Sequence, residues 1–240
     1  MSDCCDLSVW DMDVRQEPTI RVGVVLPEDD MQQVRLTIPA EPYVIGLDDM
    51  AGPTVDSTTL DATVEGERVV VQVGDQRLGP ASVVRLAPRD EQPLVRGAGI
   101  HVRGVVTGRG FHWQKRIHPA LAGPLEVRVH DGLLLVVNEV PLEHYLVGVV
   151  TGEMSGDCPL EFLKSQVVVA RSWVLALTEN KHPGLPIHRC NDDDCQRYHG
   201  TTHITARAIE AVNSTRGQVL VDNRREIIDA NYSKSCGGIS

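Results

Sequence analysis

Short apolar runs rich in β-branched residues, broken by Gly, Pro and Asp, fill most of the chain between Pro18 and about residue 140. This spacing is typical of strands joined by turns, and such a region must pair its strands into sheets. Asp131-Gly132 predicts a tight hairpin between the last two strands. Residues 39–66, rich in Pro, Gly, Asp and Thr, predict a loop or a small insertion. The predicted strands cover residues 20–26, 33–38, 68–73, 82–86, 100–106, 125–130 and 133–137.

The pattern changes at Pro141, where signals typical of helices replace those of strands. Residues 141–150 predict a short helix with Pro in its first turn, followed by a Thr-Gly turn at 151–152. A second, longer helix is predicted after Pro159, because apolar residues recur there at steps of three and four: Leu160, Leu163, Val167, Ala170, Val174 and Leu177. A third helix is expected over 205–214, followed by strands around 218–221 and 226–231.

These patterns predict an α+β fold with a polar leader at residues 1–17, a β-rich region at 18–140 and a mixed α/β region at 141–240. A groove is expected between the last two regions. The 23 Lys and Arg against 33 Asp and Glu give a net charge of −10, which argues against a nucleic-acid partner. No apolar run is long enough to predict a membrane span, and the first residues show no secretory signal pattern.

Glu153 is the first candidate for chemistry, because it follows a glycine in a predicted turn between two helices, where its side chain can project into a cleft. The simpler interpretation is a solvated or helix-capping carboxylate. Lys164 and Arg171 are seven residues apart and so share one face of the next helix. They are either a solvated stripe or a cationic edge beside Glu153 that binds an anionic group of a substrate.

Two further clusters contain residue types that carry chemistry. Residues 182–200 hold three His, a Cys190–Cys195 pair and three consecutive Asp. Two thiols and a nearby His meet most of what zinc requires, but a surface loop with a local disulfide or free thiols explains the pattern equally well. Tyr232, Ser235 and a Gly-Gly pair follow a predicted strand, either as part of a binding site or as an ordinary exit from that strand.

Three stretches together resemble the stage II sporulation protein D (SpoIID/LytB) family. They are VNEVPLEHYLVGVVTGEMSGDCPLEFLKSQVVVARSWVLAL (137–177), CNDDDCQRYHG (190–200) and NYSKSCGG (231–238). The resemblance implies a peptidoglycan lytic transglycosylase, a carbon–oxygen lyase that cuts glycan strands, with residues 141–240 as the catalytic region. Some relatives are described instead as amidase enhancers, so a non-catalytic peptidoglycan-binding activator of a cell-wall amidase is the alternative. Family members are normally exported, which implies the cell envelope or the extracellular space.

By position, Glu153 matches the family's catalytic glutamate, a general acid and then a general base that yields a 1,6-anhydro-N-acetylmuramic acid product. Arg171, Tyr232 and Ser235 match residues of the substrate groove, and Lys164 is assigned to substrate binding with them.

Cys190 and Cys195 match positions that bind a structural zinc in some members, together with two His. Asp194 stands where those members have a His, so His188 is the expected third ligand, with His182 as the alternative. A zinc hydrolase with Glu153 as its base is a weaker possibility. The family domain continues beyond Gly238, so the C-terminus resembles a truncated one.

Overall fold

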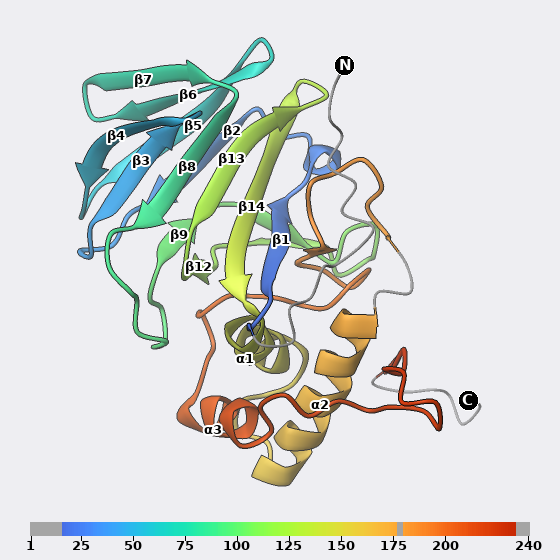
Figure 1. The fold of residues 1–240 in the computed structure, drawn as a ribbon. Helices are drawn as coiled ribbons and strands as arrows, with labels where there is room; N and C mark the ends of the chain where they lie inside the picture. The colour runs from blue at the N-terminus through green and yellow to red at the C-terminus, as the bar shows by residue number, and fades with distance from the viewer. Residues whose placement is uncertain (1–15, 177–179, 234–240) are drawn as a thin grey trace.

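The computed structural model describes residues 16–176 and 180–233 (Figure 1). The strands of its larger sheet are β1 (Thr19–Val25), β3 (Tyr43–Leu47), β4 (Met50–Val55), β8 (Val83–Pro88), β13 (Leu125–His130), β14 (Leu133–Pro141) and β15 (Arg189–Cys190). Those of the smaller sheet are β2 (Gln33–Thr37), β5 (Thr59–Glu65), β6 (Arg68–Val73), β7 (Gln76–Ala81), β9 (Ile100–Val102) and β12 (Ala120–Leu121). A separate ribbon pairs β10 (Val105–Thr107) with β11 (Lys115–Ile117).

The larger sheet has the order β15-β1-β14-β13-β8-β3-β4, and the smaller one β12-β9-β2-β5-β6-β7. All neighbours are antiparallel except β15, which runs parallel to β1. Strand β15 comes from the C-terminal part of the chain, and Val22 and Gly23 of β1 pair with its Arg189 and Cys190. The segment that contains Cys190 is therefore attached to the edge of the β-rich part.

Three helices are grouped at one end of the sheets (Figure 1): α1 (Leu142–Glu153), α2 (Leu160–Ala176) and α3 (Ala206–Ser214). A short 3-10 helix, η1 (Pro27–Asp29), follows β1. One apolar core extends from the sheets into the helices, because the same buried cluster contains Val22, Val136, Leu146 and Val167. The expected α+β class, with a β-rich N-terminal part, is thus confirmed.

Two local predictions hold in detail. Asp131 and Gly132 have φ values of +52° and +75°, the positive angles that a tight hairpin between β13 and β14 requires. In α2, four predicted core residues are at most 1% exposed: Leu163, Val167, Ala170 and Val174. Leu177, the last residue of that apolar stripe, and the leader up to residue 15 lie outside the described residues.

Four predictions of secondary structure were wrong. Residues 39–66 contain β3, β4 and β5 instead of a loop. Most of the Pro and Gly residues that suggested a loop lie between strands (Pro39, Pro42, Gly66) or in the edge strand β4 (Gly52, Pro53). Residues 100–106 break at Gly104 into two strands. Helix α1 continues through Thr151 and Gly152, so the expected turn is helical. Residues 218–231 form only a single bridge, Val221 with Ile227.

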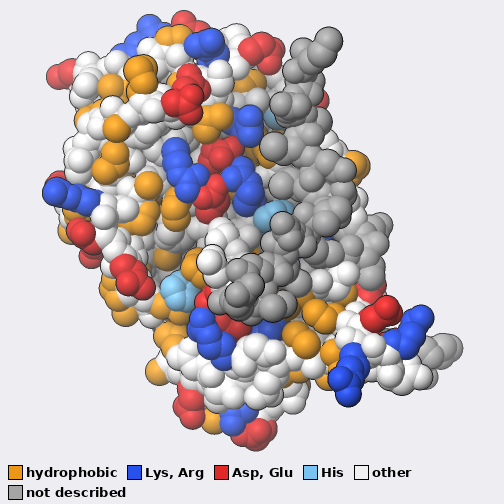
Figure 2. Space-filling view, in the orientation of Figure 1, with side chains coloured by type: hydrophobic (Ala, Val, Ile, Leu, Met, Phe, Trp, Pro, Cys, Tyr) orange, Lys and Arg blue, Asp and Glu red, His pale blue; other side chains and the backbone are white. Residues whose placement is uncertain are grey.

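The outer face of the larger sheet carries a network of ion pairs. Arg21 of β1 pairs with Glu126 of β13 at 3.0 Å and with Glu139 of β14, and Arg85 of β8 also pairs with Glu139. Figure 2 shows basic and acidic side chains gathered in the middle of the face on which these strands lie in Figure 1. Charges on this face alternate with the apolar residues that the same strands turn into the core. Among the described residues, no helix is long and apolar enough to cross a bilayer.

Candidate functional site

A pocket of about 640 Å³ lies where the helices meet the loops of the β-rich part. Its wall combines residues from before and after Pro141, so the expected groove is formed by both parts of the chain. The lining residues are Phe111, Trp113, Glu153, Met154, Trp173, Lys181, Asp193, Asp194, Cys195, Arg197, Asn231, Tyr232 and Ser233.

Glu153 is the last residue of α1 and lies in this wall. Its Oε1 accepts a hydrogen bond from the backbone N–H of Arg197 at 2.8 Å and a second from the hydroxyl of Tyr232 at 3.3 Å. Within the described part of the chain, both hydrogen bonds go to Oε1 and none goes to Oε2. The carboxyl group is therefore held by one oxygen and presents the other.

Close packing against α1 places the segment that contains Arg197. A Cβ atom at Gly152 would lie 2.4 Å from the carbonyl oxygen of Arg197, and one at Gly148 would lie 2.6 Å from the ring of Tyr198. The buried Tyr198 hydroxyl donates to Asn138 Oδ1 of β14 at 2.8 Å. The two glycines thus let this segment approach the helix closely enough for its backbone to reach Glu153.

Tyr232 keeps its proton in this environment. Burial, and then the negative charge of Glu153, raise the pKa of the Tyr232 hydroxyl above its ordinary value. A protonated phenol is a hydrogen-bond donor, and it donates to Oε1 of Glu153. The structure therefore brings together Glu153 and Tyr232, two of the residues assigned to the site from the sequence.

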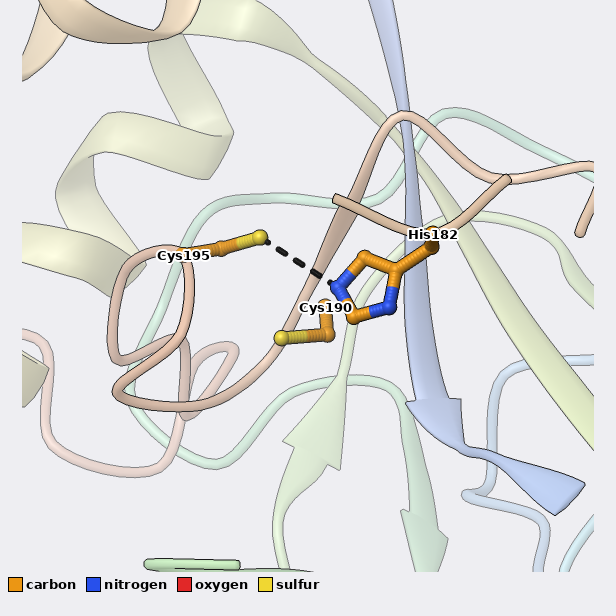
Figure 3. A group of neighbouring side chains, drawn as sticks. All are labelled: His182, Cys190 and Cys195. Atoms are coloured by element: carbon orange, nitrogen blue, oxygen red, sulfur yellow. Dashed lines mark hydrogen bonds between the residues drawn. The ribbon is translucent and has the colours of Figure 1, made fainter. Parts of the chain in front are cut away.

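A second cluster, His182, Cys190 and Cys195, lies next to the pocket, in which Cys195 takes part (Figure 3). Its nitrogen and sulfur atoms lie within 4.8 Å of one another, and Cys195 Sγ is 3.5 Å from His182 Nε2. The predicted third ligand, His188, is not part of the cluster. Its Nδ1 instead accepts a hydrogen bond from the backbone N–H of Arg21 at 3.0 Å, and burial lowers its pKa to about 4.

The chemistry of this donor set fits zinc. The hydrogen bond between the two cysteines lowers the pKa of the Cys195 thiol and raises that of the Cys190 thiol. Cys195 is thus the cysteine that more readily takes the thiolate form that metals bind. Two sulfurs and one imidazole nitrogen supply three of the four ligands of a structural site. Residues Cys190 and Cys195 with His182 would hold the metal, which would tie the loop between the two cysteines to the His182 segment.

The structure does not bring Arg171 or Lys164 to the pocket. Arg171 is completely buried, and its guanidinium donates to both carboxylate oxygens of Glu143 at 3.1 and 2.6 Å and to the carbonyl of Gln218 at 3.0 Å. Lys164 pairs with Glu161 at 2.7 Å on the outer surface of α2. Seven residues make nearly two helical turns, so both side chains leave α2 on nearly the same face. They differ in their surroundings, because Arg171 meets the buried carboxylate of Glu143 whereas Lys164 meets the exposed Glu161. Ser235 lies outside the described residues.

Sequence analysis missed several residues of the pocket. Asp193 accepts from Arg197 Nε at 2.6 Å and from Trp113 Nε1 at 3.0 Å, which links the loop after β10 to the segment that holds Glu153. Phe111 and Trp113 are themselves part of the wall. One signal was available: two large aromatics, two residues apart after Gly108-Arg109-Gly110, stand out in a chain with 4% aromatic residues.

Comparison with known proteins supports the resemblance noted in the sequence. Residues 130–221 match the model of the family SpoIID, described as Stage II sporulation protein. This part of the chain is similar to the SpoIID family. An uncharacterized protein of Brachyspira hyodysenteriae (strain ATCC 49526 / WA1) is 33% identical over 116 residues, 48% of this chain and 31% of that protein. Stage II sporulation protein D of Bacillus subtilis (strain 168) is 29% identical over 130 residues, 48% of this chain and 38% of that protein.

The matched stretches thus span about a third of the length of these curated relatives. The residues that match the SpoIID model contain α1, α2 and α3, with Glu153 and the metal-ligand cluster. Phe111, Trp113 and Tyr232 line the same pocket but lie outside the matched residues.

Proposed function

We propose that this protein cleaves peptidoglycan glycan strands as a lytic transglycosylase, with Glu153 as general acid and then general base. The observation that carries the proposal is the Glu153 carboxyl in the wall of a 640 Å³ pocket, held through Oε1 by Arg197 and Tyr232. Similarity to the SpoIID family supports a reaction on the cell wall. Peptidoglycan lies outside the cytoplasm, so the proposal also places the protein in the cell envelope or the extracellular space.

The proposed reaction needs one carboxyl group because the substrate supplies the nucleophile. Protonated Glu153 gives its proton to the glycosidic oxygen as the bond from C1 of N-acetylmuramic acid to that oxygen breaks. The resulting carboxylate then takes the proton of the C6 hydroxyl, whose oxygen forms the new bond to C1. The products are a 1,6-anhydro end and a free hydroxyl on the neighbouring sugar, and Glu153 is protonated again.

A structural zinc is part of the proposal. Bound by His182, Cys190 and Cys195, the metal would supply cross-linking of a loop and no step of the reaction. Asp193 and Arg197 lie two residues before and two residues after Cys195. Asp193 accepts a hydrogen bond from Trp113, and Arg197 donates one to Glu153 through its backbone. Fixing this loop therefore fixes the position of the acid.

The test is mass spectrometry of the products formed from glycan strands stripped of stem peptides. We expect 1,6-anhydro ends from the wild type and a loss of at least about 100-fold in rate in the Glu153→Gln variant, since removing a general acid–base has that effect. Glu161→Gln is the matched control, because Glu161 is an exposed glutamate of α2 outside the pocket.

Two results would contradict the proposal. Undiminished cleavage by the Glu153→Gln variant would remove the assigned acid. Binding of glycan strands without products from the wild type would contradict catalysis, and would favour the alternative of a non-catalytic activator of a cell-wall amidase.

A further inference from the structure

The loop between β10 and β11 presents two aromatic side chains at the pocket that contains Glu153. The rings of Phe111 and Trp113 are stacked, with centroids 4.5 Å apart and planes 5° from parallel. Their exposed fractions are 43% and 44%, which is high for side chains of this size. Exposed apolar surface gathered at a pocket is typical of a binding site. We call this pair the aromatic platform.

Hydrogen bonds and an ion pair hold the loop that carries the platform. Asp192 accepts hydrogen bonds from the backbone N–H of Gly108 at 2.6 Å and of Arg109 at 2.7 Å. The Arg109 guanidinium, 9% exposed, pairs with Asp29 at 2.7 Å. Gly108 has a φ of +72°, and a Cβ there would lie 2.5 Å from the Trp113 ring. The loop is thus ordered before any ligand binds, so binding to it costs little conformational entropy.

The platform is also connected to the acid. Trp113 Nε1 donates to Asp193 Oδ2 at 3.0 Å, Asp193 pairs with the Arg197 side chain at 2.6 Å, and the Arg197 backbone donates to Glu153 at 2.8 Å. Two hydrogen bonds and one ion pair therefore separate the indole from the carboxyl. A ligand resting on the platform lies in the same pocket as the reacting group.

We propose that the aromatic platform binds the C–H face of a pyranose ring of the glycan strand, beside the linkage that Glu153 cleaves. This inference rests on the proposed function and names a subsite for its substrate. A pyranose has an apolar face of C–H bonds, which packs on an aromatic ring, and a rim of hydroxyls that seek polar partners. The same pocket supplies such partners in Asp193, Asp194 and Asn231. The wall has three carboxylates (Glu153, Asp193 and Asp194) against two cations (Lys181 and Arg197), a balance that disfavours a phosphate-bearing ligand such as a nucleotide.

Binding is measured first, in the Glu153→Gln background, so that strands are not cut during titration. With denuded glycan strands as the probe, Trp113→Ala and Phe111→Ala are expected to raise Kd by about 10-fold, the size of one aromatic stacking contact. The Phe162→Ala variant is the matched control, since Phe162 is an aromatic of similar exposure, 47%, on α2 and outside the pocket. Its Kd should equal that of the parent.

The Trp113→Phe variant separates stacking from anchoring. It keeps an aromatic face but loses the N–H that bonds to Asp193, so we expect it to bind within about 3-fold of the parent. A loss as large as that of Trp113→Ala would overturn the stacking proposal and leave the hydrogen bond as the cause. Thermal melting of each variant verifies that the fold is intact.

Cleavage is measured second, in the wild-type background, and distinguishes this inference from the proposed function. Trp113→Ala should raise KM by about the same 10-fold and leave most of kcat, whereas Glu153→Gln should lose kcat. If the wild type makes no product but Trp113→Ala still weakens binding, the proposed function fails and the sugar subsite stands. If cleavage occurs and neither platform variant changes Kd or KM, the subsite is overturned and the function stands.

Discussion

At the scale of single residues, the contact between Gly152 and Arg197 decides where the acid lies. The carbonyl of Arg197 is 2.4 Å from the place a Cβ at Gly152 would occupy, so no other residue fits there without movement. The same segment donates its N–H to Glu153. A residue with no side chain therefore orients a carboxyl group that follows it directly in the chain.

We expect the Gly152→Ala variant to lower the rate of glycan cleavage by about 10- to 100-fold, because small displacements in an active site have costs of that order. Gly46→Ala is the control, since a Cβ at Gly46 meets its nearest atom at an ordinary 3.7 Å. Rates of anhydro-product formation, with thermal melting of both variants, test this prediction. A Gly152→Ala variant as fast as the wild type would show that the Arg197 contact does not orient Glu153.

At the scale of elements, a buried ion pair joins the two longest helices. Arg171 of α2 binds both oxygens of Glu143 in the first turn of α1, and a third contact reaches the carbonyl of Gln218 after α3. Both side chains are at most 6% exposed. Removing one partner of such a pair leaves an uncompensated buried charge. Arg171 therefore links α2 to the helix that carries Glu153, and its buried side chain is not part of the pocket wall.

We expect Arg171→Ala to lower the free energy of unfolding by about 3–5 kcal/mol. The double variant Arg171→Met with Glu143→Leu should recover much of that loss, because apolar residues of similar size need no counter-charge. Lys164→Ala, which removes an exposed pair of the same helix, should change stability by less than about 1 kcal/mol. Urea unfolding of the four proteins measures all three effects; equal losses for Arg171→Ala and Lys164→Ala would be incompatible with a buried role for Arg171.

At the scale of the whole molecule, the segment from Arg189 to Tyr198 connects parts that lie far apart in the chain. It adds β15 to the sheet edge at β1, accepts a hydrogen bond from the loop between β10 and β11 through Asp192, and contacts the end of α1 through Arg197. The metal-ligand cluster lies at its two cysteines. A bound zinc would therefore stabilise the junction between the β-rich part and the helices.

We expect the purified protein to bind one zinc per chain, with loss of the metal in the His182→Ala variant and retention in His188→Asn, which keeps an acceptor for the Arg21 N–H. Zinc held at 100 times its Kd contributes about 2.7 kcal/mol. Chelation should then lower Tm by roughly 5–11 °C. Elemental analysis and thermal melting measure both quantities, and metal content unchanged in His182→Ala would exclude this ligand set.

Local structure followed from the sequence wherever a short pattern has one physical solution. Alternating β-branched residues predicted most strands, Asp131-Gly132 predicted the hairpin, and the apolar stripe after Pro159 predicted α2. The family motif identified Glu153 as the candidate acid. The strands, the hairpin and the helix depend on residues close together in the chain, which a pattern records directly, whereas Glu153 was assigned from the resemblance.

Which distant residues become partners depends on the packing of the folded chain. Trp113 and Asp193 are 80 residues apart, and Arg171 and Glu143 are 28 apart. Spacing along a helix indicated a face for Arg171 but not the buried carboxylate that it meets there. The same holds for the choice of His182 over His188 beside the cysteine pair. Such choices follow from how sheets and helices pack, because a charged or metal-binding side chain is satisfied by the nearest suitable group in space.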